Sequence, residues 1–481
     1  MANTFLSGWP PVENSDGRKK YTLSLWLKRA GLGQMAIYSA GTSGVGGSRE
    51  TTILFTDTNH LQLDEYNGSG MDSRIVTKRL FKDETAWYHF VFITDTNNAT
   101  ANLRKRLFVN GVELTNANGD FSTNDEASSA YGGAWNNGPG TGYSGSIPSN
   151  IGAKSWNTSN RFGGYMAQIV MASEQVYEAS TFGSFDATTG EWKPKSDGEI
   201  RSAVTFGTNG FLLPFSNTSY LGYDYNTADR SGTNADWTLE GDGLQSQDNP
   251  SNNFPLVSTY WMPHNDPLFY VSEAGLYAQS QTSASTYFGG GATLGLAKGK
   301  WYWETEGGLA WNGGAIGVFS DPQNSAENDR TCGYNTYDWS YRSDGQVESN
   351  NTTQDSGMGT YTDGDVIGTY LDLDNNKIYW AKNGTIINSG TGWTITAAAS
   401  TTHGFYWPGQ GDIAGSGGSY FALNFGNGWF KVTKLTGTTY NDAQGQGIFK
   451  YSPNDGGASS FDGSAKDFLA ICTKNLKSYG G

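Results

Sequence analysis

The stretch GDVIGTYLDLDNNKIYWAKNG, residues 364–384, predicts two strands joined by a tight polar turn. Apolar and polar residues alternate on both sides of the turn DLDNN at 372–376, and this alternation is typical of half-buried strands. The Asn-Gly pair that closes the stretch is a strong signal for a second tight turn. Residues 299–306 (GKWYWETE) and 420–429 (YFALNFGNGW) have the same character. We therefore expect a β-sheet domain around this stretch.

Four segments in this part of the chain, taken in order, resemble a SPRY domain. They are Lys300–Glu304, Ala315–Val318, the strand pair 364–384 and a Phe-x-Leu-Asn-Phe-Gly segment at 421–426. The resemblance covers about residues 290–430. It implies a β-sandwich that usually serves as a binding module, and it does not by itself indicate a ligand.

The composition indicates a β-rich protein of several domains. Of the 481 residues, 66 are Gly and 14% are aromatic, whereas only 16% are charged. Aromatic residues fill pleated faces and Gly serves the turns between strands. A chain of 481 residues corresponds to roughly two to four domains.

The net charge of −15 argues against nucleic acid as a partner, because phosphate binding needs a basic surface. An anionic membrane surface is disfavoured for the same reason. No apolar run approaches the roughly 18 residues of a membrane span, so no membrane insertion is expected. The start MANTFLSGWPP lacks the charged and apolar regions of a signal peptide, which predicts synthesis in a cytoplasm. Cys332 and Cys472 are expected to be free, largely buried thiols.

A second set of strands is predicted nearer the N-terminus. Residues 21–28 (YTLSLWLK) alternate, 87–94 (WYHFVFIT) form the apolar run of a central strand, and Asn110-Gly111 marks a hairpin. Together with a later strand at Arg161–Ile169, these pieces resemble a laminin-G-like or concanavalin A-like jelly roll. The resemblance implies a second β-sandwich.

A narrower resemblance covers about residues 20–256. The motifs that follow the predicted jelly roll resemble those that follow the same domain in a group of bacteriophage virion proteins. The C-terminal residues 468–476 also resemble the ends of such proteins. The motifs of the sequel are Phe182–Asp186, Thr189–Lys195, Phe206–Phe211, the box Leu221–Asp224, Asp236–Thr238 and Gln247–Phe254.

These observations predict an all-β chain of two tandem jelly-roll-like β-sandwiches with a C-terminal extension. The connector is placed where Asn-Pro and Met-Pro pairs interrupt regular structure. The expected parts are an N-terminal arm (1–20), a concanavalin A-like/laminin-G-like sandwich with its phage-type extension (21–250), a linker (251–285), a SPRY-like sandwich (286–430) and the C-terminal extension (431–481).

Catalytic residues are not expected. Concanavalin A-like glycoside hydrolases resemble one another in a Glu-x-Asp-x-x-Glu strand, and the nearest match runs from Glu240 to Gln245. Gln245 stands in place of the final acid and cannot donate and take back a proton. The segment is also interpreted as a Gly-broken connector rather than a strand. Glu304 and Glu306 share one strand face, about 7 Å apart, and are interpreted as solvent-facing carboxylates.

No cofactor is predicted. Asp372 and Asp374 share a face of their turn, so Ca²⁺ binding is conceivable, because hard cations take several oxygen ligands. Turn formation explains the same Asp and Asn residues as well. None of the four histidines has a histidine partner two or four residues on, so no zinc site is expected. His89 is interpreted as a strand residue with satisfied hydrogen bonds.

Aromatic residues in loops are the candidate ligand-binding residues. Loops on rigid sandwiches often carry function, and aromatic side chains line many ligand sites. For the stretch 118–150 the alternative interpretation is a long surface loop, and for each aromatic residue of the SPRY-like sandwich it is packing in the core or at its edge. The candidates are Trp135 and Tyr143 in the Gly/Asn/Ser-rich stretch 118–150, and Trp339, Tyr341, Trp393 and Trp407 in or near loops of the SPRY-like sandwich.

The resulting hypothesis is a non-enzymatic bacteriophage virion protein, a tail fibre or a capsid fibre or decoration, exposed on the virion surface. Its expected partners are host-surface glycan and other virion proteins. A homo-oligomer is also expected, with a trimer favoured, because copy number multiplies weak contacts. One alternative is a purely structural virion protein that binds no sugar. A second is a polysaccharide depolymerase, which needs two carboxyl groups about 5–10 Å apart in a groove.

Overall fold

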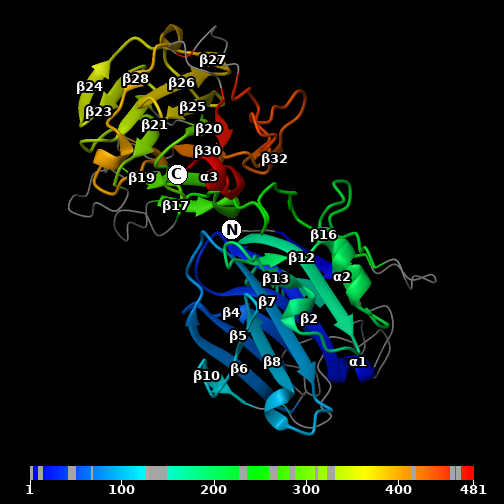
Figure 1. Cartoon of the computed structure of the whole chain (residues 1–481). Helices are drawn as coiled ribbons and strands as arrows, with labels where there is room; N and C mark the ends of the chain where they lie inside the picture. Colours follow the sequence, from blue (N-terminus) through cyan, green and yellow to red (C-terminus); the bar gives the residue numbers. More distant parts are fainter. Residues whose placement is uncertain are drawn as a thin grey trace. The chain divides into compact units, whose positions relative to one another are not determined.

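The computed structural model divides the chain into two compact units, Met1–Gln245 (unit 1) and Ser246–Gly481 (unit 2). Both units are built almost wholly of strands (Figure 1), and each forms a β-sandwich, so the predicted fold class is confirmed. No helix in the described part of the chain is long and apolar enough to cross a membrane. The structure describes residues 4–8, 15–41, 50–66, 69–125, 127, 149–226, 236–258, 269–280, 288–308, 313–321, 331–412, 419–454, 461 and 467–480.

Unit 1 contains two large antiparallel sheets. The strands of its first sheet are β1 (Phe5–Gly8), β3 (Met35–Gly41), β4 (Glu50–Phe55), β5 (His60–Tyr66), β6 (Met71–Leu80), β10 (Phe121–Asn124), β11 (Ser149–Ile151) and β16 (Thr238–Glu240). Those of its second sheet are β2 (Lys20–Arg29), β7 (Trp87–Asp95), β8 (Lys105–Val109), β9 (Val112–Leu114), β12 (Gly164–Ser173) and β15 (Phe211–Leu213). The spatial orders are β10-β6-β5-β4-β3-β11-β1-β16 and β15-β12-β2-β7-β8-β9. A hairpin of β13 (Gly183–Phe185) and β14 (Trp192–Pro194) and the helices α1 (Ser15–Lys19) and α2 (Asp197–Ala203) accompany them.

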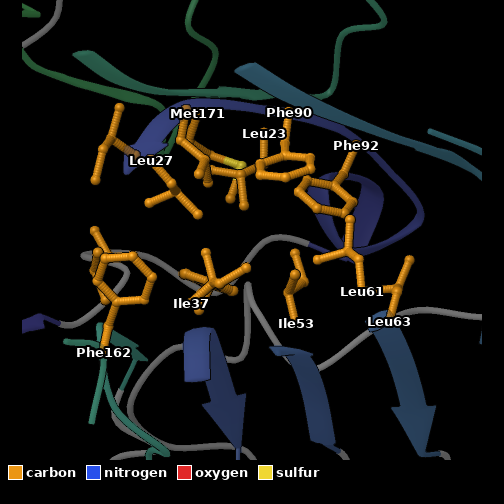
Figure 2. Packing of buried hydrophobic residues seen from close by; sticks show 14 of the residues in the cluster. Leu23, Leu27, Ile37, Ile53, Leu61, Leu63, Phe90, Phe92, Phe162 and Met171 are labelled. Atoms are coloured by element: carbon orange, nitrogen blue, oxygen red, sulfur yellow. The ribbon is translucent and has the colours of Figure 1, made fainter. Parts of the chain in front are cut away.

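The core of unit 1 lies between these two sheets. Figure 2 shows Leu23, Phe90 and Phe92 of the second sheet pointing toward Ile37 and Ile53 of the first, and all five are buried. Alternate residues of a strand point to the same face. The spacing of apolar residues in β2 and β7 therefore places these side chains on the inner face of the sheet. Burial of each such side chain contributes about 1.5–3 kcal/mol.

The outer face of the second sheet is buried as well. Val91 on β7 packs in a second apolar cluster with Ile200 of α2 and with Phe206. Helix α2 begins with a capping box between Ser196 and Glu199, which satisfies amide groups at its start. The segment that follows β12 in the sequence therefore covers the side of the sheet that the sandwich core does not.

Unit 2 also contains two large sheets. The strands of its first sheet are β17 (Phe269–Ser272), β18 (Tyr277–Ser280), β20 (Lys300–Gly308), β25 (Val366–Asp372), β26 (Lys377–Lys382), β27 (Thr385–Ile386), β28 (Trp393–Thr394), β30 (Tyr420–Asn424) and β33 (Leu469–Ala470). Those of its second sheet are β19 (Phe288–Gly291), β21 (Gly314–Phe319), β22 (Trp339–Arg342), β23 (Val347–Ser349), β24 (Thr352–Asp355) and β29 (Trp407–Asp412). The orders are β17-β18-β30-β20-β25-β26-β27, with β28 on β26 and β33 parallel to β20, and β19-β29-β21-β22-β23-β24. A hairpin of β31 (Trp429–Phe430) and β32 (Thr433–Lys434) and the helix α3 (Thr473–Tyr479) complete the unit.

Strand register assigns the inner face of the first sheet of unit 2. Trp303, Thr369 and Trp380 are direct neighbours across β20, β25 and β26. The ring of Trp380 lies 6.1 Å from that of Tyr341 on β22. This row therefore faces the second sheet and belongs to the interior of the sandwich.

The opposite, outer face carries a row of tyrosines, Tyr302, Tyr370 and Tyr379, on the same three strands. We call residues 448–454, 461 and 467–480 the C-terminal strap, because they cross this face. The ring of Phe461 lies 4.9 Å from Tyr370 and 5.1 Å from Tyr379, and the ring of Phe468 lies 5.1 Å from Tyr370. The strap thus buries the tyrosine row under its own aromatic side chains.

The structure differs from the expected boundaries of the parts at several points. Strand β1, inside the expected arm, pairs with β11 and β16. Strands β17 and β18, inside the expected linker, pair with each other and then with β30. These strands are only four residues long, so the alternation in them is too short to separate a strand from a loop.

The interpretation of Glu304 as a solvent-facing carboxylate is wrong, because its side chain is completely buried. It lies on the outer face of β20 beneath the strap, whose residue Lys450 donates a backbone N–H to it. Glu306, two residues on, stays partly exposed and pairs with Lys431 at 3.3 Å. The two cysteines are free and buried, as expected.

Candidate ligand-binding site

Two of the six candidate residues, Trp135 and Tyr143, lie outside the described residues. A third, Tyr341, is fully buried. Its hydroxyl donates to the Gly359 carbonyl at 2.7 Å, and its strand register opposite Ile316 places it on the inner face of the second sheet. Tyr341 is therefore a core residue and does not face a ligand.

Trp393 and Trp339 are half-buried. Trp393 lies on β28 with its ring 5.4 Å from the buried Trp380. Trp339 begins β22 opposite Val318, whereas Trp407 begins β29 opposite Phe319. Because consecutive residues of β21 point to opposite faces, Trp339 and Trp407 lie at the same end of the second sheet but on different sides of it. The structure does not bring these candidates together as one surface.

Trp407 instead belongs to a cluster that the sequence did not single out. The ring of Phe405 lies 5.7 Å from Trp407 and the ring of His403 lies 6.1 Å from it. The Nε2 atom of His403 lies 3.1 Å from Oδ1 of Asp321. We call these four residues the aromatic rim. Residue spacing does not predict this cluster, because residues 401–404 form bends and Gly404 has a φ of 76°, so His403 and Phe405 do not lie on one extended strand.

The exposed part of the aromatic rim consists of its two outer side chains. Phe405 is 41% exposed and the His403 side chain is 48% exposed, whereas Trp407 is almost buried and supports them. A Cβ at Gly295 would lie 2.9 Å from the Trp407 indole, so Gly at this position allows the indole to pack closely. An aromatic face beside an imidazole and a carboxylate offers stacking together with hydrogen bonds to hydroxyl or amide groups.

The carboxyl groups with the most perturbed chemistry in unit 2 are not accessible. Burial raises the pKa of Glu304 to about 7 and that of Asp338 to about 6. Asp338 accepts hydrogen bonds from Ser320 and from Asn335. Because both carboxyl groups are fully buried, neither provides the accessible acid that glycoside hydrolysis requires.

The segment compared with the hydrolase motif also has structural partners. Glu240 ends β16, so part of the expected connector is a strand. Its carboxylate accepts a hydrogen bond from Ser7 at 3.2 Å. Gln245 donates to the carbonyl of Phe215 at 2.7 Å.

The acidic turn considered for Ca²⁺ is held by donors from the chain itself. Asp372 accepts hydrogen bonds from the backbone and the side chain of Asn375. Asp374 accepts one from the backbone of Gly299. Among the described residues, no group of three or more His, Cys, Asp and Glu side chains is arranged to hold a metal ion.

Comparison with known families agrees with this architecture. Residues 9–150 match the concanavalin A-like lectin/glucanases superfamily, and residues 300–405 match the SPRY domain. The chain carries a concanavalin A-like domain and a SPRY domain. No curated protein matches the sequence. Neither match includes the segments that cover the outer faces, which are the region around α2 in unit 1 and the strap in unit 2.

Similar solved structures are SPRY domains. That of human HERC1 has 17% identity and a TM-score of 0.28, and the match covers 35% of this chain and 96% of that one. A human SPRY domain has 14% identity and a TM-score of 0.24, and the match covers 32% of this chain and 94% of that one. The PSpry domain of TRIM65 has 13% identity and a TM-score of 0.27, and the match covers 36% of this chain and 92% of that one.

Proposed function

We propose that this chain is a non-enzymatic bacteriophage virion protein that binds host-surface glycan through the aromatic rim of its SPRY domain. The observation that carries the binding proposal is the grouping of exposed Phe405 and His403 around Trp407, with Asp321 beside them. Sugar rings present C–H faces and hydroxyl groups, and the rim offers an aromatic face, an imidazole and a carboxylate. The virion role is supported by the resemblance of residues 182–254 to phage proteins of this type.

A single site of this kind binds weakly, because it buries little surface and is open to water. Repetition on the particle surface supplies the avidity, since linked sites turn later binding events into intramolecular ones. The proposal therefore includes a homo-oligomer, with a trimer favoured, attached to other virion proteins on the virion surface.

The test measures the purified protein on a panel of host-surface polysaccharides, scoring both retention and release of reducing ends. Wild type is expected to be retained without release. Phe405→Ala is expected to weaken binding about tenfold, as the loss of a central aromatic contact does. The matched control is Phe185→Ala, because Phe185 is also an exposed Phe packed against a Trp, but in unit 1.

Other outcomes would redirect the proposal. Equal binding by the Phe405 and Phe185 variants would exclude the aromatic rim as the site. Release of reducing ends by wild type would replace the adhesin with a depolymerase. Retention on no polysaccharide would overturn glycan binding and favour the purely structural virion role.

A further inference from the structure

The described residues cover only part of the outer face of the first sheet of unit 2. The strap lies over the tyrosine row, and Phe430 of the β31–β32 hairpin packs with Val366 and Ala422. Toward the edge strand β17, one further row of cross-strand neighbours follows, which consists of Tyr270, Gln279, Tyr420 and Gly308. Tyr270 is 45% exposed, and Gln279 and Tyr420 are half-buried. This end of the sheet therefore presents side chains that a ligand can contact.

The aromatic rings at this end are held in a fixed arrangement. The ring of Tyr277 is stacked on that of Tyr420, with 5.3 Å between the centroids and 27° between the planes. A Cβ at Gly308 would overlap the Tyr420 ring, so glycine at this position allows the ring to lie across β20. The ammonium of Lys431, in the turn of the β31–β32 hairpin, lies 3.9 Å from the Tyr420 centroid and donates to its hydroxyl at 2.6 Å. Side chains that are already ordered lose little conformational entropy on binding.

Polar groups converge on the same rings. The hydroxyls of Tyr270 and Tyr277 both donate to Oε1 of Gln279, the second at 3.1 Å. Among the described residues Nε2 of Gln279 has no hydrogen-bond partner, so its two N–H groups can donate to a ligand. The Tyr420 hydroxyl donates to the exposed carboxylate of Asp363 at 2.6 Å. We define the edge platform as Tyr270, Tyr277, Gln279, Asp363, Tyr420 and Lys431.

The charges at the edge platform limit the class of ligand. Lys431 pairs with Glu306 at 3.3 Å, and Asp363 adds a second carboxylate. These two carboxylates repel an anionic ligand. A cationic ligand is repelled by the Lys431 ammonium, which already lies over the ring of Tyr420. A neutral ligand with hydroxyl groups is not repelled. Its hydroxyls can donate to Asp363 and accept from the amide of Gln279, while its C–H groups contact the exposed tyrosine ring.

We propose that the edge platform is a second saccharide-binding site of unit 2, specific for neutral sugar units of a glycan. It is separate from the aromatic rim, because the rim lies where β21 ends and β29 begins in the second sheet, whereas the platform lies on the outer face of the first. The ligand class rests on the proposed glycan binding, but the platform does not need the rim in order to bind. Two weak sites in one domain strengthen the retention of a long polysaccharide chain.

The experiment is affinity electrophoresis of the full chain in gels that contain a neutral or an anionic host-surface polysaccharide, since the retardation gives the Kd. Wild type is expected to be retarded by a neutral polysaccharide. Tyr270→Ala is expected to raise this Kd about three- to tenfold, as the loss of an aromatic contact does. The matched control is Tyr479→Ala. Tyr479 is a tyrosine of unit 2 with 43% exposure, but it lies beside Gly299 at the opposite end of β20 from Gly308, so the Kd should not change.

The variants distinguish the edge platform from the aromatic rim. A raised Kd for Tyr270→Ala but not for Phe405→Ala would support the platform and exclude the rim. A raised Kd for Phe405→Ala alone would overturn the platform and leave the rim in place. Retardation of wild type by anionic polysaccharides alone would overturn the platform and leave glycan binding standing, whereas retardation by none would overturn both.

A second variant is used if Tyr270→Ala disrupts the edge strand β17, as shown by a loss of the thermal transition of unit 2. Gln279→Ala keeps all three tyrosine rings and removes the amide. It is expected to raise the Kd about threefold or more, because a hydrogen-bond donor to the ligand is lost. An unchanged Kd for Gln279→Ala would overturn the platform.

Discussion

In each unit the outer face of one sheet is covered by a segment from late in that unit's sequence, but the two segments bury different polar groups there. In unit 1 the group is His89 on β7, and in unit 2 it is Glu304 on β20. Both side chains are fully buried and both are hydrogen-bonded to the covering segment, through Trp192 and through Tyr451 respectively. One group is a base that is neutral when buried, and the other is an acid that is charged at neutral pH unless its pKa rises.

The imidazole of His89 has a defined proton arrangement. The indole N–H of Trp192 can only donate, so it donates to Nδ1 of His89 at 3.0 Å. The ring proton therefore resides on Nε2 and is donated to Oγ of Ser24 at 2.8 Å. The stacked ring of Trp26 at 4.6 Å completes the enclosure. His89 thus cannot act as a base toward Ser24, and the pair is structural, as expected for a satisfied strand residue.

The two groups make the units respond to pH in opposite directions. Burial lowers the pKa of His89 to about 3 from 6.5, so unit 1 loses stability as the pH falls below 6.5 and the unfolded chain binds the proton. Burial raises the pKa of Glu304, so unit 2 gains stability over much of the same range. The comparison teaches that the choice of buried polar group decides how a covering segment depends on pH.

The largest expected effect tests whether the strap is part of the fold of unit 2. Deleting residues 448–481 exposes the tyrosine row and removes Phe461 and Phe468 from it. We expect unit 2 to lose its cooperative thermal transition, because several large side chains lose burial worth about 1.5–3 kcal/mol each. Calorimetry should show the transition of unit 1 unchanged. A deletion protein that keeps both transitions would show that the sandwich is stable without its strap.

The next effect is the opposite dependence of the stability of the two units on pH, through His89 and Glu304. Between pH 7 and 4.5 we expect unit 1 to lose about 3 kcal/mol through His89 and unit 2 to gain about 3 kcal/mol through Glu304, since one pKa unit corresponds to about 1.4 kcal/mol. Calorimetry over this range should show the two transitions moving in opposite directions. Glu304→Gln serves as the control and should reduce the shift of the unit 2 transition without changing that of unit 1. A part of the unit 2 shift should remain, because burial also raises the pKa of Asp338 to about 6. Parallel movement of both transitions would contradict the comparison.

A smaller effect tests the hydrogen bond between neutral His89 and Ser24 in unit 1. Ser24→Ala leaves the Nε2 proton of His89 without an acceptor, and a buried unpaired donor costs about 1–3 kcal/mol. Urea unfolding of unit 1 should report this loss. The control Ser7→Ala removes a hydroxyl whose hydrogen bond to Glu240 is exposed, and it should cost less than about 0.5 kcal/mol. Equal effects of the two variants would argue against the assigned role of Ser24.

The smallest expected effect on stability belongs to the aromatic rim. Because Phe405 is 41% exposed, Phe405→Ala should change the unfolding free energy of unit 2 by less than about 1 kcal/mol. A loss of glycan binding in this variant would then reflect the contact and not the fold. A loss of several kcal/mol would instead make Phe405 a packing residue. Comparing the stability of this variant with that of the strap deletion would distinguish the aromatic side chains of unit 2 that support the fold from those that can bind a ligand.

Much of the fold could be predicted from local pattern. The alternation in residues 21–28 and 364–384 corresponds to β2 and to the pair β25–β26, because a strand places every second residue on one face. The candidate site was less predictable. Tyr341 is of a residue type that often binds ligands, but its strand register opposite Ile316 directs its side chain into the core. Phe405 and His403 become candidate binding residues only because the folded chain places them against Trp407.

The sequence by itself determined the fold class, the order of the two sandwiches and the two faces of each long strand, because these depend on the period of apolar residues along the chain. Only the tertiary structure decided which outer face is covered and by what. The strap reaches Glu304 from residues 450 and 451, and α2 reaches Val91 from residue 200. Contacts across more than a hundred residues leave no local pattern, so the burial of a carboxylate or an imidazole could be seen only in the folded chain.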